Sequence, residues 1–289
     1  MEKTNRNDLC WCGSNEKYKQ CHEEIDQILH SWQKKGFDIP SRSIIKTRTQ
    51  IEGIKKSGQL TKMILDMLEE RIIPGINTLQ IDSWVFKYTI DHGGFPAPLN
   101  YRGFPRSVCT SINQVICHGI PDETIINEGD IINIDVTTIL NGFYADASRM
   151  YYAGNVSPQA DTLVKCAHEC MNLGIKQVKP YTSLQNIGYV IEQYASTQGY
   201  SVVKDYGGHG IGLQFHEEPF VGHYADSCEK GYILAPGMVF TIEPMINAGS
   251  SECTLLADRW TTITKDGSLS AQWEHTILVT PEGFEILTA

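Results

Sequence analysis

The sequence predicts a mixed α/β (α+β) domain of two similar halves, preceded by a small N-terminal extension. Two long stretches of the chain each predict a pair of helices followed by strands. Thr78-Leu79-Gln80 begins the second helix of the first stretch, and Ser183-Leu184-Gln185 stands at the same place in the second. Because a repeat of about one hundred residues is far longer than a solenoid unit, it indicates two halves packed together. Cysteines and a histidine gather within residues 8–22, ahead of both halves.

The composition fits one large domain with a small attachment. The chain has 289 residues, of which 41% are hydrophobic, and a catalytic domain of about 250 residues buries a core without further staples. The net charge of −10 excludes a general nucleic-acid binder. The charge is uneven, since residues 1–48 hold nine Lys/Arg and seven Asp/Glu.

Cysteine usage and hydropathy predict a cytoplasmic location. No signal peptide and no apolar run of membrane length are visible in the sequence. Nine cysteines in such a chain indicate free thiols in a reducing compartment. We therefore expect a cytoplasmic monomer that makes no contact with a membrane.

Helices are expected at the start of the first half. Helical spacing of apolar residues predicts a helix that starts near Arg48 and ends at Pro74-Gly75. The residues that carry this spacing are Ile51, Ile54, Leu65, Leu68 and Ile72. A second helix is expected from Thr78 to His92, with Thr78 as its N-cap and Gly93-Gly94 as its end.

The second half repeats this order. Ser157-Pro158 starts a helix that Pro180 ends. Thr182 or Ser183 starts the next helix, which stops near Gly199. Strand-like stretches follow each helix pair, as expected for a duplicated unit.

Five candidate metal ligands follow one another through the last half of the chain. They are Asp135, Asp146, His209, Glu243 and Glu274. Four carboxylates and one imidazole suit two hard or borderline divalent ions better than one zinc in a sulfur cage. A paired-metal site makes hydroxide from water near neutral pH and polarises a carbonyl, so the set predicts a metallohydrolase.

The segment 130–152 predicts a β-hairpin that brings the two aspartates together. Asn141-Gly142 is the strongest short signal for a type I′ turn. With that turn Thr137 faces Asp146, and Asp135 lies two residues from Thr137 on the same face of the sheet. The two aspartates are then diagonal neighbours, with β-carbons roughly 5–8 Å apart. A pair of exposed strand aspartates is the alternative, but Asp135 interrupts an apolar run, where a buried charge needs a partner.

The remaining candidates stand in glycine-rich or strand-like surroundings. The glycines of GGHGIG do not fit the spacing of a nucleotide-binding loop, and they let the backbone at His209 come close to a ligand. His118 ends a strand-like stretch and His216 follows in FHEEP, and for each an ordinary structural histidine is the alternative. Glu243 and Glu274 are expected inside apolar strands, where a lone glutamate is costly unless it is paired or binds metal. Two unrelated salt bridges are the alternative for these glutamates.

Taken in order, these segments resemble the type I methionine aminopeptidases over residues 45–289. The matching segments are VCTSINQVICHGIP, NIDVT, GGHGIG, FHEEP, TIEPM and WEHTILVT. The resemblance implies the pseudo-twofold pita-bread fold, which agrees with the predicted duplication. It also implies an enzyme that removes the N-terminal methionine from nascent proteins and peptides when the second residue is small.

The resemblance assigns the five ligands to a two-metal site. Asp135, Asp146 and Glu274 would contact both metal positions, and His209 and Glu243 would complete the set. The ions could be Mn, Co, Fe(II) or Zn, because all of them tolerate such ligands. Hydroxide activated by the two ions would attack the scissile carbonyl, and the metal would anchor the free α-amine of the substrate.

The resemblance also gives roles to residues that surround the metals. His118 would contact the scissile amide or help to protonate the leaving nitrogen, His216 would stabilise the tetrahedral intermediate, and Glu243 would relay a proton. The methionine side chain would lie in a pocket formed by Tyr101, Phe104, Cys109, Phe215 and Trp260. A soft, largely aromatic pocket suits a flexible thioether.

Two other functions are compatible with the same fold. An Xaa-Pro-type aminopeptidase usually carries a large N-terminal domain and lacks the methionine-pocket sequence. A non-enzymatic binding protein would have lost metal ligands, and every ligand position is filled here. The aminopeptidase is therefore the favoured prediction.

The N-terminal cluster predicts a structural zinc site in a domain of its own. Cys10, Cys12, Cys21 and His22 supply three thiolates and one imidazole, a closed tetrahedral set. The segment resembles the SEC-C zinc motif. We expect residues 1–38 to form this motif with a basic linker, and residues 39–289 to form the catalytic domain.

The basic run that follows the cluster has two interpretations. Its residues are Lys34, Lys35, Arg42, Lys46 and Arg48, with Pro40-Ser41-Arg42-Ser43 as the expected linker. Residues 1–48 could dock on ribosomal RNA, and a solvated linker is the equally weighted alternative.

Overall fold

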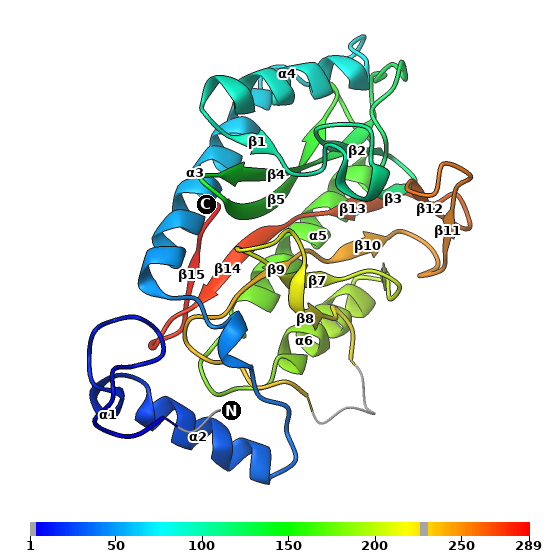
Figure 1. The fold of residues 1–289 in the computed structure, drawn as a ribbon. Helices are drawn as coiled ribbons and strands as arrows, with labels where there is room; N and C mark the ends of the chain where they lie inside the picture. The colour runs from blue at the N-terminus through cyan, green and yellow to red at the C-terminus, as the bar shows by residue number, and fades with distance from the viewer. Residues whose placement is uncertain (1–3, 226–230) are drawn as a thin grey trace.

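Helices and strands follow one another in two similar groups, as Figure 1 shows for the computed structural model. The structure describes residues 4–225 and 231–289. The helices of the two groups are α3 (Arg48–Leu68) and α4 (Thr78–Asp91), then α5 (Pro158–Ile175) and α6 (Gln185–Thr197). Strands follow each helix pair, so the predicted order of elements is confirmed in both halves.

The strands are short except for one hairpin. Those of the first half are β1 (Phe95–Pro96), β2 (Cys109–Ile112), β3 (Val115–Cys117), β4 (Ile131–Leu140) and β5 (Phe143–Tyr152). Those of the second half are β6 (Ser201–Val202), β7 (Gly208–Gly210), β8 (Glu217–Val221), β9 (Val239–Ile242), β10 (Met245–Asn247), β11 (Cys253–Leu255), β12 (Thr262–Thr264), β13 (Ser270–Gln272), β14 (His275–Val279) and β15 (Phe284–Ile286). Two 3₁₀ turns complete the elements, η1 (Arg42–Ile44) and η2 (Tyr101–Gly103).

The hairpin of β4 and β5 forms in the predicted register. Asn141 and Gly142 have φ angles of 52° and 83°, the left-handed values that a type I′ turn requires. Thr137 pairs with Asp146 across the two strands, as predicted. β1 and β2 pair with the other edge of β4, so Asp135 lies near the middle of a four-stranded sheet.

Capping boxes begin both helices of the first half. The side chains of Thr47 and Asn77 accept hydrogen bonds from the third amide of α3 and α4, respectively. The prediction that Thr78 is the N-cap of α4 is therefore wrong by one residue. Thr78 is the first helical residue, and its hydroxyl donates to the carbonyl of Asp122 instead.

Two helices end earlier than predicted. α3 ends at Leu68 rather than near Pro74, and α5 ends at Ile175 rather than at Pro180. The chain closes one more turn after each helix. The amide of Arg71 donates to the carbonyl of Leu68, and the amide of Val178 donates to the carbonyl of Ile175. The prolines therefore follow the helices and do not terminate them.

Each helix pair covers its own sheet, so the apolar core has two main parts. In the first half, Leu65 of α3 packs with Val136 of β4. In the second half, Ile187 of α6 and Phe240 of β9 belong to one buried cluster, and β9 lies within the sheet of order β15-β14-β9-β7-β8. Each such side chain contributes roughly 1.5–3 kcal/mol when fully buried. Each half therefore has an apolar core of its own.

The N-terminal extension is packed against the second core. α1 (Tyr18–Cys21) and α2 (Glu23–Lys34) lie together at the lower left of Figure 1. Leu29 of α2 is fully buried within the same cluster as α5 and α6. Backbone hydrogen bonds then join Asp38 to Gly231 and Ile233. Residues 22–48 are therefore ordered against the main domain.

Two residues of the predicted basic run pair with carboxylates of the fold. Arg42 donates to the buried Asp26 and lies over the rings of Trp11 and Tyr18. Lys46 has a side chain that is 1% exposed. The ammonium group of Lys46 is therefore withdrawn from the surface, and Arg42, whose side chain is 18% exposed, is held by Asp26.

Two further sequence predictions concern membranes and thiols. Within the part of the chain that the structure describes, every helix is too short or too polar to cross a membrane. The eight cysteines among the described residues are all free thiols.

Candidate active site

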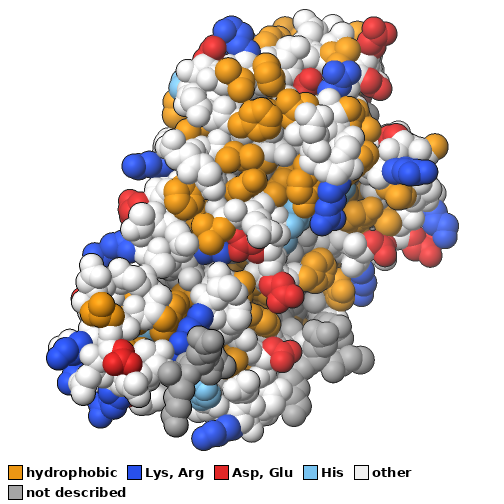
Figure 2. Space-filling view, in the orientation of Figure 1, with side chains coloured by type: hydrophobic (Ala, Val, Ile, Leu, Met, Phe, Trp, Pro, Cys, Tyr) orange, Lys and Arg blue, Asp and Glu red, His pale blue; other side chains and the backbone are white. Residues whose placement is uncertain are grey.

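A cavity of about 310 Å³ lies between the two halves, and all the metal-ligand, catalytic and substrate-binding residues predicted from the sequence line it. They are Tyr101, Phe104, Cys109, His118, Asp135, Asp146, His209, Phe215, His216, Glu243, Trp260 and Glu274. Figure 2 shows hydrophobic side chains gathered around the central hollow of this face, in which a histidine is visible. The fold thus brings twelve residues from widely separated segments into one space.

The β4–β5 hairpin supplies the two aspartates. The hydroxyl of Thr137 donates to Asp146 Oδ1 at 2.8 Å, and the Asp146 amide donates to Thr276 Oγ1 at 3.0 Å. These bonds fix one carboxylate and leave its second oxygen for another partner. Asp135 Oδ1 is buried and has no hydrogen-bond partner among the described residues. A buried carboxylate oxygen without a donor indicates a site for a cation.

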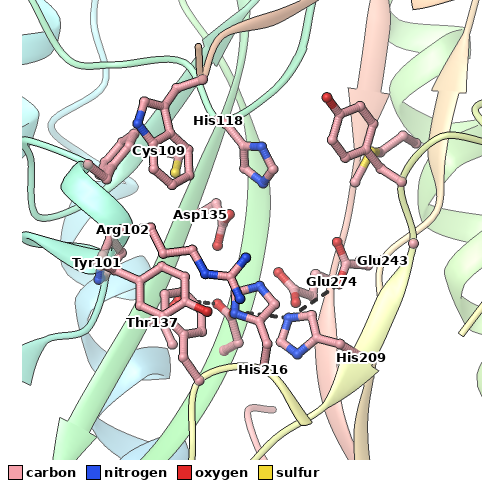
Figure 3. Close-up of a pocket in the computed structure, with 18 of the residues that line it drawn as sticks. Tyr101, Arg102, Cys109, His118, Asp135, Thr137, His209, His216, Glu243 and Glu274 are labelled. Atoms are coloured by element: carbon pink, nitrogen blue, oxygen red, sulfur yellow. Dashed lines mark hydrogen bonds and ion pairs between the residues drawn. The ribbon is translucent and has the colours of Figure 1, made fainter. Parts of the chain in front are cut away.

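The two glutamates lie at a break in the strands, which corrects the prediction that they stand inside strands. Ile242 pairs with His275 at the end of the β9–β14 ladder. The β10–β13 ladder resumes beyond Pro244, which cannot donate a backbone hydrogen bond. Glu243 and Glu274 occupy the unpaired gap between the ladders, where they face the hairpin across the cavity (Figure 3).

Hydrogen bonds orient Glu243 within this gap. The Thr241 hydroxyl donates to Glu243 Oε1 at 2.7 Å, and Gln272 Nε2 donates to Oε2 at 3.2 Å. The Glu243 amide donates to Nε2 of the buried His223 at 3.1 Å. Both carboxylate oxygens are therefore held by neutral donors, which leave the negative charge uncompensated.

His209 presents an unprotonated nitrogen to these carboxylates. Its Nδ1 lies 2.9 Å from the carbonyl of Gly210, which can only accept, so Nδ1 carries the proton. Nε2 then offers its lone pair, at 3.9 Å from both Asp146 Oδ2 and Glu243 Oε1. Ligand atoms of Asp146, His209 and Glu274 all lie within 4.8 Å of one another. A fixed tautomer of this kind is typical of a metal-binding histidine.

The four carboxyl groups destabilise one another in the absence of a cation. Burial, then the charges of Asp146 and Glu243, raise the pKa of Asp135 well above its usual range. Burial chiefly raises the pKa of Glu243 to about 8, and Glu274 and Asp146 also have raised pKa values. Divalent cations would neutralise this cluster, so the residues present fit the two ions that the sequence predicts.

Two further histidines face the cavity in the neutral form. His118 has a left-handed φ of 57°, which turns its ring toward Tyr206 and Trp260. Burial lowers the pKa of His118 to about 4. Desolvation, then the nearby His209, lowers the pKa of His216 to about 3. Both rings are therefore uncharged at neutral pH and can donate one N–H each.

Aromatic rings form the other side of the cavity. Phe104 and Trp260 meet edge to face at 5.2 Å, and Tyr101 lies 4.7 Å from Phe215 between ring centroids. Cys109 is 7% exposed beside them. This apolar recess opens directly onto the carboxylate cluster, as the positions of Tyr101 and Cys109 in Figure 3 show.

Several lining residues were not identified from the sequence. They are Pro98, Arg102, Thr137, Asp205, Tyr206, Gly207, Phe220 and Met245. Thr137 was detectable, because it lies two residues from Asp135 on one strand face. Tyr206 lies in an irregular segment and Arg102 in the short turn η2, and no local pattern shows that such a residue faces a cavity.

The N-terminal cysteines form a second cluster far from this cavity in the sequence. Cys12 Sγ and Cys21 Sγ are 3.5 Å apart, and His22 Nδ1 lies 3.2 Å from Cys10 Sγ. A tetrahedral zinc with bonds of about 2.3 Å to sulfur has edges of roughly 3.8 Å. The cluster approaches that size, and Trp11 covers His22 at 4.4 Å between rings.

Comparison with known proteins identifies the family. The family described as metallopeptidase family M24 matches residues 52–281. The chain is 52% identical over 243 residues to methionine aminopeptidase A of Synechocystis, an alignment that covers 84% of this chain and 96% of that protein. The chain belongs to the M24 methionine aminopeptidases.

Other methionine aminopeptidases extend this similarity to the whole chain and to the fold. The enzyme of Chlamydia trachomatis is 45% identical over 292 residues and the alignment covers 98% of both chains. The crystal structure of methionine aminopeptidase from Rickettsia prowazekii has a TM-score of 0.83 at 46% identity, covering 85% of this chain and 99% of that one. The predicted pita-bread fold is therefore confirmed. The SEC-C motif also matches residues 6–24, as predicted.

The Xaa-Pro peptidases share only the fold with this methionine aminopeptidase. An Xaa-Pro dipeptidase from Bacillus anthracis has a TM-score of 0.67 at 22% identity. The chain spans 62% of that protein. The predicted preference for a methionine aminopeptidase is confirmed by the identities of 52% and 45% to the enzymes of Synechocystis and Chlamydia trachomatis.

Proposed function

We propose that this enzyme removes the N-terminal methionine from peptides and nascent proteins whose second residue is small. The proposal rests on one observation, a single cavity that has a charged side and an apolar side. A cluster of four carboxylates and one imidazole stands beside an apolar recess lined by aromatic rings and a thiol. Such a recess suits a methionine side chain, because thioethers contact aromatic rings favourably. The cluster then lies beside the first peptide bond.

The metal-holding residues in this proposal are Asp135, Asp146, His209, Glu243 and Glu274. The unpartnered Oδ1 of Asp135 and the raised pKa values of the carboxyl groups support it. Two divalent ions bound there would supply a water nucleophile active near neutral pH and a Lewis acid for the carbonyl. Mn, Co, Fe(II) and Zn all suit such a donor set.

Three side chains have proposed roles in the reaction itself. Glu243 accepts a proton from the attacking water, since Thr241 and Gln272 hold its carboxylate in place within the cluster. His118 donates a ring N–H toward the scissile amide and helps to protonate the leaving nitrogen. His216 donates toward the oxygen that gains negative charge. Both imidazoles are neutral N–H donors. Their hydrogen bonds therefore become stronger as negative charge develops in the transition state.

The surroundings of the enzyme belong to the same proposal. Free thiols are typical of a reducing compartment, which supports a cytoplasmic location. The proposal takes the enzyme to be a monomer. Docking on the ribosome would use the exposed lysines of the extension, among them Lys19, Lys34 and Lys35. The boundary near residue 38 then separates a docking motif from the catalytic domain, although the two pack together.

Peptide cleavage tests the proposed function. The wild-type enzyme with Mn, Co, Fe(II) or Zn restored should release methionine from Met-Ala-Ser. Release from Met-Lys-Ser should be at least roughly 10²-fold slower, because a large second side chain must fit beside the metals. Ala-Ala-Ser and Ala-Pro-Ser serve as controls and should stay intact. Cleavage of Ala-Pro-Ser in preference to Met-Ala-Ser would indicate an Xaa-Pro peptidase, and no cleavage of any peptide would indicate a binding protein.

Metal analysis tests the proposed N-terminal zinc. The double variant Cys12→Ser/Cys21→Ser should contain one zinc fewer per chain, because half of the tetrahedral set is gone. Turnover of Met-Ala-Ser should stay within about threefold of wild type, since none of the proposed catalytic groups lies in the motif. Cys166→Ala, a buried cysteine of α5, is the control and should keep all metals. Unchanged zinc content in the double variant would contradict the proposed ligands.

A further inference from the structure

An ion pair joins Lys46, just before α3, to Glu217 at the end of residues 213–217. Lys46 donates through Nζ to Glu217 Oε2, and these residues are 171 positions apart in the chain. The side chain of Lys46 is 1% exposed and that of Glu217 is 11% exposed. A lysine buried to this degree is unfavourable without an anionic partner. The fold therefore holds Lys46 against Glu217 specifically, and the contacts of Glu217 show what this pair holds in place.

Glu217 uses its other oxygen to close the active-site loop, residues 213–217. Oε1 accepts hydrogen bonds from the amides of Leu213 at 2.7 Å and Gln214 at 2.9 Å. Charge-assisted bonds of this kind are roughly twice as strong as neutral ones. One carboxylate thus ties both ends of the loop together and attaches them to Lys46.

The position of Lys46 is fixed from both sides by backbone. Its amide donates to the carbonyl of Gly237 at 2.8 Å. At Gly212, an added Cβ would lie 3.2 Å from Cε of Lys46, so the lysine stem passes close to this part of the chain. The ammonium group is therefore anchored by the main domain and has little freedom to follow the loop.

The loop carries two residues of the proposed site. The ring of Phe215 lies 4.7 Å from that of Tyr101 in the methionine recess. The ring of His216 stacks on Tyr101 at 5.3 Å and lies 4.1 Å from His209. Figure 3 shows His216 and His209 side by side below the carboxylates. A movement of the loop would displace both the recess and the imidazole.

We propose that Lys46 is a positioning residue for methionine removal, which acts through Glu217 to hold Phe215 and His216 in place. The inference rests on the proposed function, because the loop that Lys46 holds carries two residues of the proposed active site. Lys46 touches no reacting atom. A misplacement of about 1 Å in a catalytic group costs roughly 10²-fold in rate, so a small shift of the loop is enough.

The test uses a variant that loses the pair without leaving a charge buried. In Lys46→Met/Glu217→Gln both side chains become neutral and keep a similar length, and the carboxamide oxygen introduced at position 217 can still accept from the loop amides. The protein should therefore fold and bind both ions. Its kcat/KM on Met-Ala-Ser should fall by roughly 10²-fold, mainly through kcat, because His216 would act on the transition state.

The chain offers a matched control in a second Lys–Glu pair. Lys55→Met/Glu285→Gln removes a partly exposed pair between α3 and β15, at 2.9 Å. This variant should keep kcat/KM within about threefold of wild type, because Lys55 forms ion pairs only with Glu52 and Glu285 among the described residues.

A double-mutant cycle separates positioning from a general structural role. In a His216→Ala background, adding Lys46→Met/Glu217→Gln should lower kcat/KM by less than the same change does in wild type. The NMR resonance of the His216 ring should also shift in the Lys46 variant and not in the Lys55 control, whichever peptide is cleaved.

Three outcomes would overturn the inference. One is a folded, metal-loaded Lys46→Met/Glu217→Gln enzyme with kcat/KM within about threefold of wild type. The second is an equal loss with and without His216. The third is an unmoved His216 resonance. Failure of the wild-type enzyme to cleave Met-Ala-Ser would instead refute the proposed function, and the resonance would still test the anchor.

Discussion

Asp135→Asn is expected to abolish methionine release. The Oδ1 of Asp135 is buried and has no hydrogen-bond partner among the described residues, and burial and then the charge of Asp146 raise the pKa of this carboxyl group. Only a cation makes such a group favourable as an anion. An amide at this position offers a weaker, neutral ligand. Changes in residues that merely support a ligand cost roughly 10–100-fold in metal affinity or activity, so loss of the ligand itself should cost more.

The measurement is turnover of Met-Ala-Ser at limiting metal, with metal content determined on the same sample. Asp161→Asn is the matched control, since Asp161 lies on α5 and pairs with Lys165 at the surface. The control should keep wild-type turnover and both ions. If Asp135→Asn keeps near wild-type turnover under limiting metal, the proposed metal site is wrong.

The aspartate pair was predictable because local rules determine it. The Asn141-Gly142 turn sets the register of β4 and β5, and the strand period then decides which residues share a face. Asp135 and Asp146 follow from these two facts alone. No contact outside the hairpin is needed to bring the two aspartates into the same cavity.

The setting of the glutamates was only partly predictable. Their apolar surroundings indicate strands, and this is correct for the residues on either side. The break at Glu243 and Glu274 arises from the pairing of two segments about thirty residues apart, with Pro244 unable to bridge the gap. Residue type thus predicted the two glutamates as candidate ligands, whereas nonlocal pairing decided how they reach the cavity.

The N-terminal extension shows where composition misled. Ile25, Leu29 and Trp32 recur at helical spacing and pack on the second core, but polar neighbours obscured the pattern. Arg42 and Lys46 were counted as surface charge, and both have buried anionic partners. A charge count does not show which charges pair with one another. Glu217 is 171 positions from Lys46, so the sequence alone does not identify it as the partner of Lys46.

Removal of the metals is expected to make the protein less stable as the pH rises from 6.5 to 8.5. A carboxyl whose folded pKa is raised contributes a penalty that is absent below its unfolded pKa and complete above its folded pKa. Glu243 has a folded pKa of about 8 against a usual value of 4.5, so its penalty grows through this window. Each pH unit corresponds to about 1.4 kcal/mol. Buried histidines such as His118, with a lowered pKa of about 4, change stability mainly below pH 6.5, where the imidazole of the unfolded chain is protonated.

The thermal midpoint of metal-stripped enzyme should therefore fall between pH 6.5 and 8.5, while that of metal-loaded enzyme stays nearly constant. Bound cations stabilise the ionised carboxylates, so the gap between the two forms widens with pH. Glu243→Gln provides the decisive variant. It removes the titrating group and keeps the size of the side chain, so the stripped variant should be more stable than stripped wild type at pH 8.5 and nearly inactive when metal is added. Parallel pH profiles for stripped and loaded wild-type enzyme would show that these carboxyl groups do not repel one another, and that the charge cluster needs no cation.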